Sequence, residues 1–117
     1  MTREMFMKFM AERIESMKTK YEAKNREYSD AADVFSNFKQ AAAMNGNTPQ
    51  EALWGMLTKH IISIKDMVYG WNDFKDQYRN ERMVKEKIGD AVVYLILLEG
   101  MMLNDIEEDN EKNRINF

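Results

Sequence analysis

The chain has 117 residues, of which 44% are hydrophobic and 32% are charged, with only five glycines and one proline. This length predicts one domain, and the composition excludes a disordered chain and disfavours a β-rich one. The formal net charge of -3 supplies no basic surface, so we expect no long nucleic acid as a partner. Because there is no cysteine, disulfides, thiolate metal sites and a cysteine nucleophile are excluded.

The first residues do not resemble a signal peptide, because Lys8, Glu12 and Arg13 interrupt the apolar residues and no small-residue cleavage site follows. The longest apolar run, residues 91–98, is far shorter than the roughly 20 residues that span a bilayer. The sequence therefore predicts a soluble protein inside the cell with no membrane partner.

Between residues 3 and 26, apolar side chains recur every three or four residues, as in an amphipathic helix with one buried stripe. The stripe consists of Phe6, Phe9, Met10, Ile14, Met17 and Tyr21. Ser29 and Asp30 are suited to an N-cap, and helical spacing resumes after them from Val34 to about Met44. Two helices are therefore predicted before the first strong turn.

The clearest boundary in the sequence lies at residues 45–51. Residues 45–47 are typical of a C-cap and turn. Thr48 then supplies an N-cap, Pro49 the first helical position and Glu51 a capping box, so a helix is predicted over about residues 49–69. The face that we expect to pack on the core carries Leu53, Leu57, Ile61, Ile64 and Val68.

Gly70 ends this helix, and the polar residues 71–79 with their spaced aromatic side chains predict either a short amphipathic helix or an ordered loop. The last helix is predicted to begin near Asn80 or Glu81 and to end near Leu103. Its middle is apolar almost all round, and a helix of this kind is buried on more than one side.

Residues 104–117 are acidic and lack a sustained apolar stripe, so we expect a flexible C-terminal tail that frays into solvent. The predicted fold is therefore a single all-α domain over residues 1–103, a bundle of four to five helices, followed by this tail.

Two carboxylates in the last helix are the first candidates for chemistry. Glu86 and Asp90 are four residues apart and share one face, and Asp90 directly precedes the apolar run. Joined by carboxylates of another helix, they would hold Mg²⁺, which prefers oxygen ligands and keeps waters and substrate phosphates in its shell. The structural alternative is that Glu86 is solvated and favoured by the helix dipole, and that Asp90 pairs with a lysine.

A second polar line runs along the helix predicted over residues 49–69. Lys59, Ser63 and Asp66 follow one another at i, i+4 and i+7, beside the only histidine. Functionally, Lys59 would bind phosphate, Ser63 would donate a hydrogen bond and Asp66 would ligate a metal. The alternative is structural: Lys59 or Lys65 would neutralise Asp90 across a helix pair, and the histidine would be a packing residue.

A third polar cluster surrounds the first turn, where Asp30 and Asp33 lie close to Asn37 in sequence, with Lys24 and Arg26 upstream. These side chains would close over a nucleotide, or alternatively would cap the following helix with solvated neighbours. The eleven methionines of the chain are typical of an adaptable core or a subunit interface.

Three segments resemble one family. Residues 86–95 read E-K-I-G-D-A-V-V-Y-L and resemble the E-E-L-G-D-x-L-x-Y-L helix of the MazG-like all-α nucleoside triphosphate pyrophosphohydrolases. Residues 28–30 (Y-S-D), with Asn37 and Phe38, resemble the Y-G-D…N-F turn of divergent, phage-associated members. Residues 48–66 are similar to the middle helix of small proteins from phages and prophages of Gram-positive bacteria.

The resemblance implies a metal-dependent activity. In that superfamily, carboxylates on adjacent helices bind Mg²⁺, and an activated water cleaves the α–β phosphoanhydride to release pyrophosphate. By position, the implied metal ligands and catalytic residues are Glu86, Asp90 and Asp66. The implied substrate-binding residues are Lys59, Lys87, Asp30, Asn37 and Ser63.

The leading hypothesis is therefore a phage-type MazG-like protein in the bacterial cytoplasm that binds a nucleotide with Mg²⁺ as cofactor and hydrolyses it. Because its last helix is so apolar, we also expect a homo-oligomer. The alternative hypothesis is a non-catalytic helical interaction protein that binds a host or phage protein. It is motivated by Lys87, which stands where the motif has a second glutamate and which cannot ligate Mg²⁺ at neutral pH.

Overall fold

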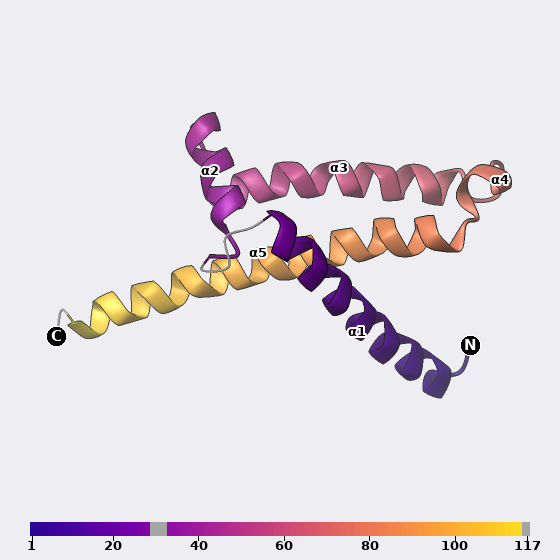
Figure 1. Cartoon of the computed structure of the whole chain (residues 1–117), viewed down its shortest axis with the longest axis horizontal. Coiled ribbons are helices and arrows are strands. Elements are labelled where there is room, and N and C mark those ends of the chain that lie inside the picture. Colours follow the sequence, from indigo (N-terminus) through magenta and orange to yellow (C-terminus); the bar gives the residue numbers. More distant parts are fainter. Residues whose placement is uncertain (29–32, 116–117) are drawn as a thin grey trace. The chain divides into compact units, whose positions relative to one another are not determined.

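The computed structural model describes residues 1–28 and 33–115, and these residues form five α-helices and no strand, so the all-α prediction is confirmed. The helices are α1 (Arg3–Tyr28), α2 (Ser36–Asn45), α3 (Pro49–Tyr69), α4 (Lys75–Tyr78) and α5 (Glu81–Ile115) (Figure 1). The backbone divides into two compact units, Met1–Ser36 and Asn37–Phe117. None of the helices in the described ranges combines the length and the apolar character that crossing a bilayer requires.

The first unit contains α1, which begins at the predicted residue and runs to Tyr28. Thr2 caps it, because its hydroxyl accepts a hydrogen bond from the Met5 amide at 3.1 Å. The predicted burial of the apolar stripe is wrong for its first four residues, since for example Phe6 and Ile14 are 49% and 56% exposed, whereas Met17 and Tyr21 are half-buried. A single helix has no second element of its own unit against which to bury such a stripe.

The helix α2 begins at Ser36, later than the sequence pattern predicts. The Asp33 carboxylate accepts a hydrogen bond from the Phe35 amide at 2.9 Å, and its carbonyl accepts one from the Ser36 amide at 3.2 Å. This Asx-type turn competes with helical hydrogen bonds, so Val34 and Phe35 lie in a turn although their spacing is helical. The predicted N-cap at residues 29–30 lies outside the described residues.

The helix α3 has the predicted bounds, and its capping box is complete. The Thr48 hydroxyl accepts from the Glu51 amide at 3.1 Å, and the Glu51 carboxylate accepts from the Thr48 amide at 3.0 Å. The latter bond favours the charged carboxylate and lowers the pKa of Glu51. Gly46, in the turn before this cap, has a φ of +70°, which suits glycine.

A tight turn joins α3 to α5 and contains the short helix α4, one of the two predicted alternatives for this segment. The Arg79 side chain donates from Nε to the Trp71 carbonyl at 3.1 Å and lies 5.2 Å from the Trp71 ring centroid. Gly70 packs against the Tyr78 ring so closely that a Cβ there would lie 2.8 Å from Cδ2. The turn therefore admits no side chain at position 70.

α3 and α5 run antiparallel, side by side (Figure 1), and we call this pair the hairpin. Two contacts define its register: the Gln50 side chain donates to the Asp105 carboxylate at 2.5 Å, and the rings of His60 and Tyr94 lie 5.0 Å apart. Each step forward along α3 therefore matches one step back along α5. The buried side chains of the hairpin are Ala52, Leu53, Leu57 and Met67 of α3, and Ala91 and Met101 of α5.

The core of the hairpin is narrower than the sequence predicts. Ile61 and Val68, which we expected to pack on the core, are 44% and 62% exposed. Gly89 and Ala91 of α5 are both buried although they lie on nearly opposite faces, so the predicted burial of this helix on more than one side is confirmed at that turn. It is wrong one to two turns later, where Leu95 and Ile96 are 48% and 61% exposed on faces that α3 does not cover.

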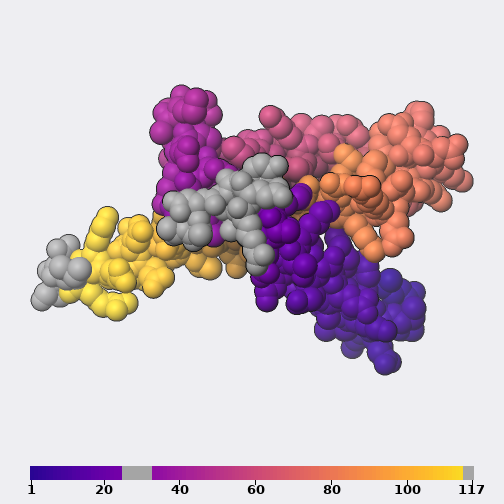
Figure 2. All heavy atoms as spheres, in the orientation of Figure 1, coloured from indigo at the N-terminus to yellow at the C-terminus, as the bar shows by residue number. Residues whose placement is uncertain are grey.

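The predicted end of the last helix near Leu103 is also wrong, because α5 continues to Ile115. Asn104 and Glu108 are hydrogen-bonded at i, i+4, which is a spacing that supports a helix. The side chains of residues 104–114 are exposed, in agreement with their acidic composition. Figure 2 shows this part of α5 projecting beyond α3.

Candidate functional site

The hairpin has two unlike sides, which follow from helix geometry. The buried residues define the direction in which each helix faces the other. At 3.6 residues per turn, each remaining position then falls on one side of the hairpin, on the opposite side, or on the outer face. The polar side carries Lys59, Ser63 and Asp66 of α3 and Glu86 and Asp90 of α5. The apolar side carries Trp54, Ile61 and Val68 of α3 and Ile88, Leu95 and Met102 of α5, and the charged Lys65 and Glu99 lie at its outer margin.

The register brings four of the predicted site residues to neighbouring levels of the polar side. Asp66 lies at the height of the turn of α5 that contains Asp90. Ser63 lies about one turn nearer the N-terminus of α3 than Asp66. Glu86 lies one turn before Asp90 on the same helix. The polar side therefore joins carboxylates from two helices at about one height.

Lys59 is not at this height. It lies level with the turn of α5 near Ile96, so it is displaced along the axis from Glu86 by roughly 14 Å at 1.5 Å per residue. A lysine side chain on its own does not span that distance. Lys59 can thus reach a phosphate only at the far end of an extended ligand.

The exposure of the carboxylates differs. Asp66 and Glu86 are exposed, whereas Asp90 is half-buried. The Lys65 ammonium lies 3.8 Å from the Asp66 carboxylate, in a pair whose side chains are 59% and 56% exposed, and such a pair contributes little to stability. Lys65 therefore contacts Asp66, its neighbour in sequence, in a pair that the structural alternative did not include.

Lys87 lies on the face of α5 that is directed toward α3, and it is half-buried. Lys87 follows Glu86 directly and precedes Asp90 by three residues, so it belongs to the same turns of α5 as the two carboxylates. An ammonium group donates hydrogen bonds and cannot ligate a cation, so its chemistry at this place is phosphate binding or charge neutralisation.

The side chains of the polar side meet only part of what Mg²⁺ requires from its ligands. Within residues 1–28 and 33–115, no three His, Asp or Glu side chains are grouped closely enough to hold a metal ion by themselves. Mg²⁺ is commonly bound through one or two carboxylates together with substrate phosphates and water, and Glu86 and Asp90 match that smaller requirement. The residues therefore fit a cation that arrives with a phosphate ligand.

Tyr94 contacts aromatic rings from two other helices. The ring of Phe38 lies 6.1 Å from Tyr94 in an edge-on contact, one turn beyond Asp90, and this contact holds α2 near the polar side. Asn37, next to it, is exposed. His60 packs on Tyr94, as the structural alternative predicted. Asp30 lies outside the described residues.

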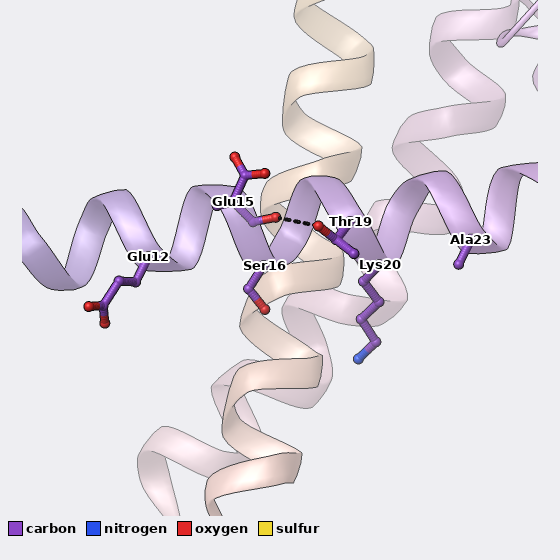
Figure 3. A pocket seen from close by; sticks show the side chains of 6 residues that line it. All are labelled: Glu12, Glu15, Ser16, Thr19, Lys20 and Ala23. Atoms are coloured by element: carbon purple, nitrogen blue, oxygen red, sulfur yellow. Dashed lines mark hydrogen bonds between the residues drawn. The ribbon is translucent and has the colours of Figure 1, made fainter.

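A further depression lies on α1, where no sequence pattern predicts a site. Figure 3 shows the six residues that line it, Glu12, Glu15, Ser16, Thr19, Lys20 and Ala23. Their only interaction drawn there is the hydrogen bond that the Thr19 hydroxyl donates to the Glu15 carbonyl at 3.1 Å. Since all six belong to one helix, they form an open surface and enclose no ligand.

Comparisons of the chain with protein-family models, with curated proteins and with solved structures found no match. The only indications of the chemistry of the polar side are therefore its own residues. It offers carboxylate oxygens from two helices, a hydroxyl group and ammonium groups, which together suit a cation and phosphates.

Proposed function

We propose that the chain is a phage-type MazG-like protein that binds a nucleoside triphosphate with Mg²⁺ on the polar side of the hairpin and cleaves it to pyrophosphate. One observation carries the proposal: Asp66 and Asp90, from different helices, lie level on one side, with Glu86 one turn away. The likeness of residues 86–95 to the metal-binding helix of that superfamily adds support.

Each residue of the polar side has a role in this proposal. Glu86 and Asp90 hold the cation together with substrate phosphates and water, and Asp66 contacts this shell through water. Bound Mg²⁺ neutralises phosphate charge and polarises the phosphoryl oxygens. Lys87 donates to the phosphates nearest the carboxylates, and Lys59 reaches the far end of the nucleotide. The proposal also assigns Ser63, Asn37 and Asp30 to hydrogen bonds with the substrate.

The experiment is pyrophosphate release from a panel of canonical and modified deoxynucleoside triphosphates, with Mg²⁺ or Mn²⁺. We expect the variants Glu86→Gln and Asp90→Asn to lose about 100-fold or more in rate, since even the loss of an outer-shell partner of a metal costs about 10–100-fold. Both variants keep the size of the side chain and remove only its charge.

The matched control is Glu99→Gln, which makes the same change on α5 but away from the polar side. The control should keep the rate of the original chain. Release from no substrate of the panel, or a rate that Glu86→Gln and Asp90→Asn leave unchanged, would sink the catalytic proposal.

A second function is favoured by α1. Its apolar stripe is exposed, with Phe6, Phe9 and Met10 at 49%, 43% and 37%, and exposed apolar stripes mark protein-binding surfaces. On this alternative the chain is a non-catalytic interaction protein that binds a host or phage protein. A pull-down from a bacterial lysate should then recover one stoichiometric partner that Phe6→Glu abolishes, and recovery of no partner would count against it.

A further inference from the structure

The only Asn-Gly pair of the chain lies where α2 ends. Asn45 is the last residue of α2, and Gly46 follows it with a φ of +70°. The Asn47 amide donates a hydrogen bond to the Ala42 carbonyl at 3.1 Å, which is the bond that closes many helices on a glycine. Residues 43–48 are all exposed, so this turn is in contact with solvent.

The Asn45 side chain is not held in place as those of other asparagines are. The side-chain oxygens of Asn72 and Asn80 accept hydrogen bonds at 2.9 and 3.0 Å. Asn45 forms no such bond with any residue of the ranges 1–28 and 33–115. Gly46 has no side chain to shield its own backbone nitrogen, and the space beside it is open, because a Cβ there would meet no atom within 4 Å.

We propose that Asn45 is a site of spontaneous deamidation. The Gly46 backbone nitrogen gives up its proton and attacks Cγ of the Asn45 side chain. A bond forms between these two atoms, the bond from Cγ to the side-chain nitrogen breaks, and that nitrogen leaves as ammonia. Water then opens the resulting succinimide ring at either of its carbonyl groups, which yields aspartate or isoaspartate at position 45. The reaction consumes one water molecule and involves no oxidation or reduction.

The end of α2 controls when this reaction takes place. In the succinimide ring, Cβ of Asn45 and the Gly46 nitrogen lie on the same side of the Cα–C bond, which the helical ψ of about −42° does not allow. Asn45 therefore reacts only when the last turn of α2 has opened. Helix ends open far more easily than a whole domain unfolds, so the reaction proceeds in the folded chain.

The modification changes the connection between α2 and α3. Isoaspartate adds one methylene group to the main chain at the turn, and both products add a carboxylate to the C-terminus of α2, where the helix dipole disfavours negative charge. We therefore expect α2 to fray and the edge-on contact between Phe38 and Tyr94 to loosen. The inference does not depend on the proposed nucleotide chemistry.

The test is incubation of the full chain in mildly alkaline buffer, followed by tryptic mass spectrometry. The tryptic peptide 40–59 contains Asn45 and Asn47, which fragmentation distinguishes. Asn45 should be converted from amide to acid, and Asn47, which precedes the branched Thr48, should stay an amide. The net charge of the chain should shift by one unit, from -3 to -4, and an isoaspartate-specific methyltransferase should label the product. An unchanged Asn45, or equal conversion of Asn47, would overturn the proposal.

Two variants test the route of the reaction. Asn45→Gln should lose the charge shift, because the same attack would require a larger ring. Gly46→Ala should slow the conversion, because its methyl group crowds the attacking nitrogen, although the φ of +70° strains alanine and frays the end of α2. Fraying alone would speed the conversion, so the two effects have opposite signs. Conversion of Gly46→Ala at the original rate or faster would overturn the proposal.

Discussion

The two sides of the hairpin are built from the same two helices and the same register, yet they place different demands on the structure. The apolar side requires only that nonpolar side chains lie at matching heights, because nonpolar contacts have no preferred direction. The cation that we propose for the polar side would require oxygen atoms within about 2.1 Å, so a small shift between α3 and α5 would change whether it binds. The core and the turn that fix the register therefore support both sides.

Substitutions in the core between the two sides should have the largest effect on the free energy of unfolding. Leu57 is completely buried, so Leu57→Ala should lower the free energy of unfolding by about 2–5 kcal/mol. Ile62, on the outer face of the same helix, is 49% exposed, and Ile62→Ala should change it by only about 0.5 kcal/mol. Urea unfolding measures both. Equal losses would show that the inner face of α3 is not the core.

The turn that sets the register is the next place to test. Gly70→Ala forces a methyl group against the Tyr78 ring and should cost about 1–3 kcal/mol. Gly55→Ala, in the open middle of α3, has nothing within 4 Å and should stabilise the chain by about 0.5–1 kcal/mol. The midpoint temperatures of thermal unfolding of the two variants should therefore shift in opposite directions. A shift of both in the same direction would contradict the close packing of Gly70 against Tyr78.

The N-cap of α3 lies farther from either side and should show a smaller effect. Thr48→Ala removes the hydroxyl that accepts the Glu51 amide hydrogen bond and should cost about 1 kcal/mol at neutral pH. Thr48→Ser keeps that hydroxyl and serves as the control in chemical unfolding. If the two variants are equally stable, the cap contributes nothing beyond the helix itself.

The smallest expected effect is a pH dependence at the same cap. The folded pKa of Glu51 is lowered from its ordinary value of 4.5, because its carboxylate accepts the Thr48 amide hydrogen bond. The stabilisation is therefore present above pH 4.5 and is lost as the pH falls through the lower folded pKa. Glu51→Gln should be less stable than the original chain at neutral pH, and this difference should shrink on acidification. A difference that is independent of pH would contradict this assignment.

Local signals in the sequence were sufficient for part of the fold. Thr48, Pro49 and Glu51 predict the start of α3 because a capping box is formed by residues within one turn of each other. The start of α2 could not be found in the same way, since the Asp33 side chain competes with the helix for backbone amides. Apolar periodicity cannot show where α5 ends, because an exposed polar helix has none.

For the candidate site, spacing along one helix predicts that Glu86 and Asp90 share a face, but the height of Asp66 depends on the register of two helices. That register is set by contacts far apart in sequence, and no local pattern contains it. Periodicity likewise identifies the apolar positions of α1 and α5, but not whether another part of the chain covers them.

We propose that one particular surface, the polar side of the hairpin, binds a nucleotide with Mg²⁺. Isothermal titration of a deoxynucleoside triphosphate into the original chain, Asp90→Asn and Glu99→Gln, with and without Mg²⁺, tests it most directly. We expect Mg²⁺-dependent binding by the original chain and Glu99→Gln, and a loss of about 100-fold in affinity for Asp90→Asn. Absence of Mg²⁺-dependent binding by the original chain, or equal affinities for the two variants, would contradict it.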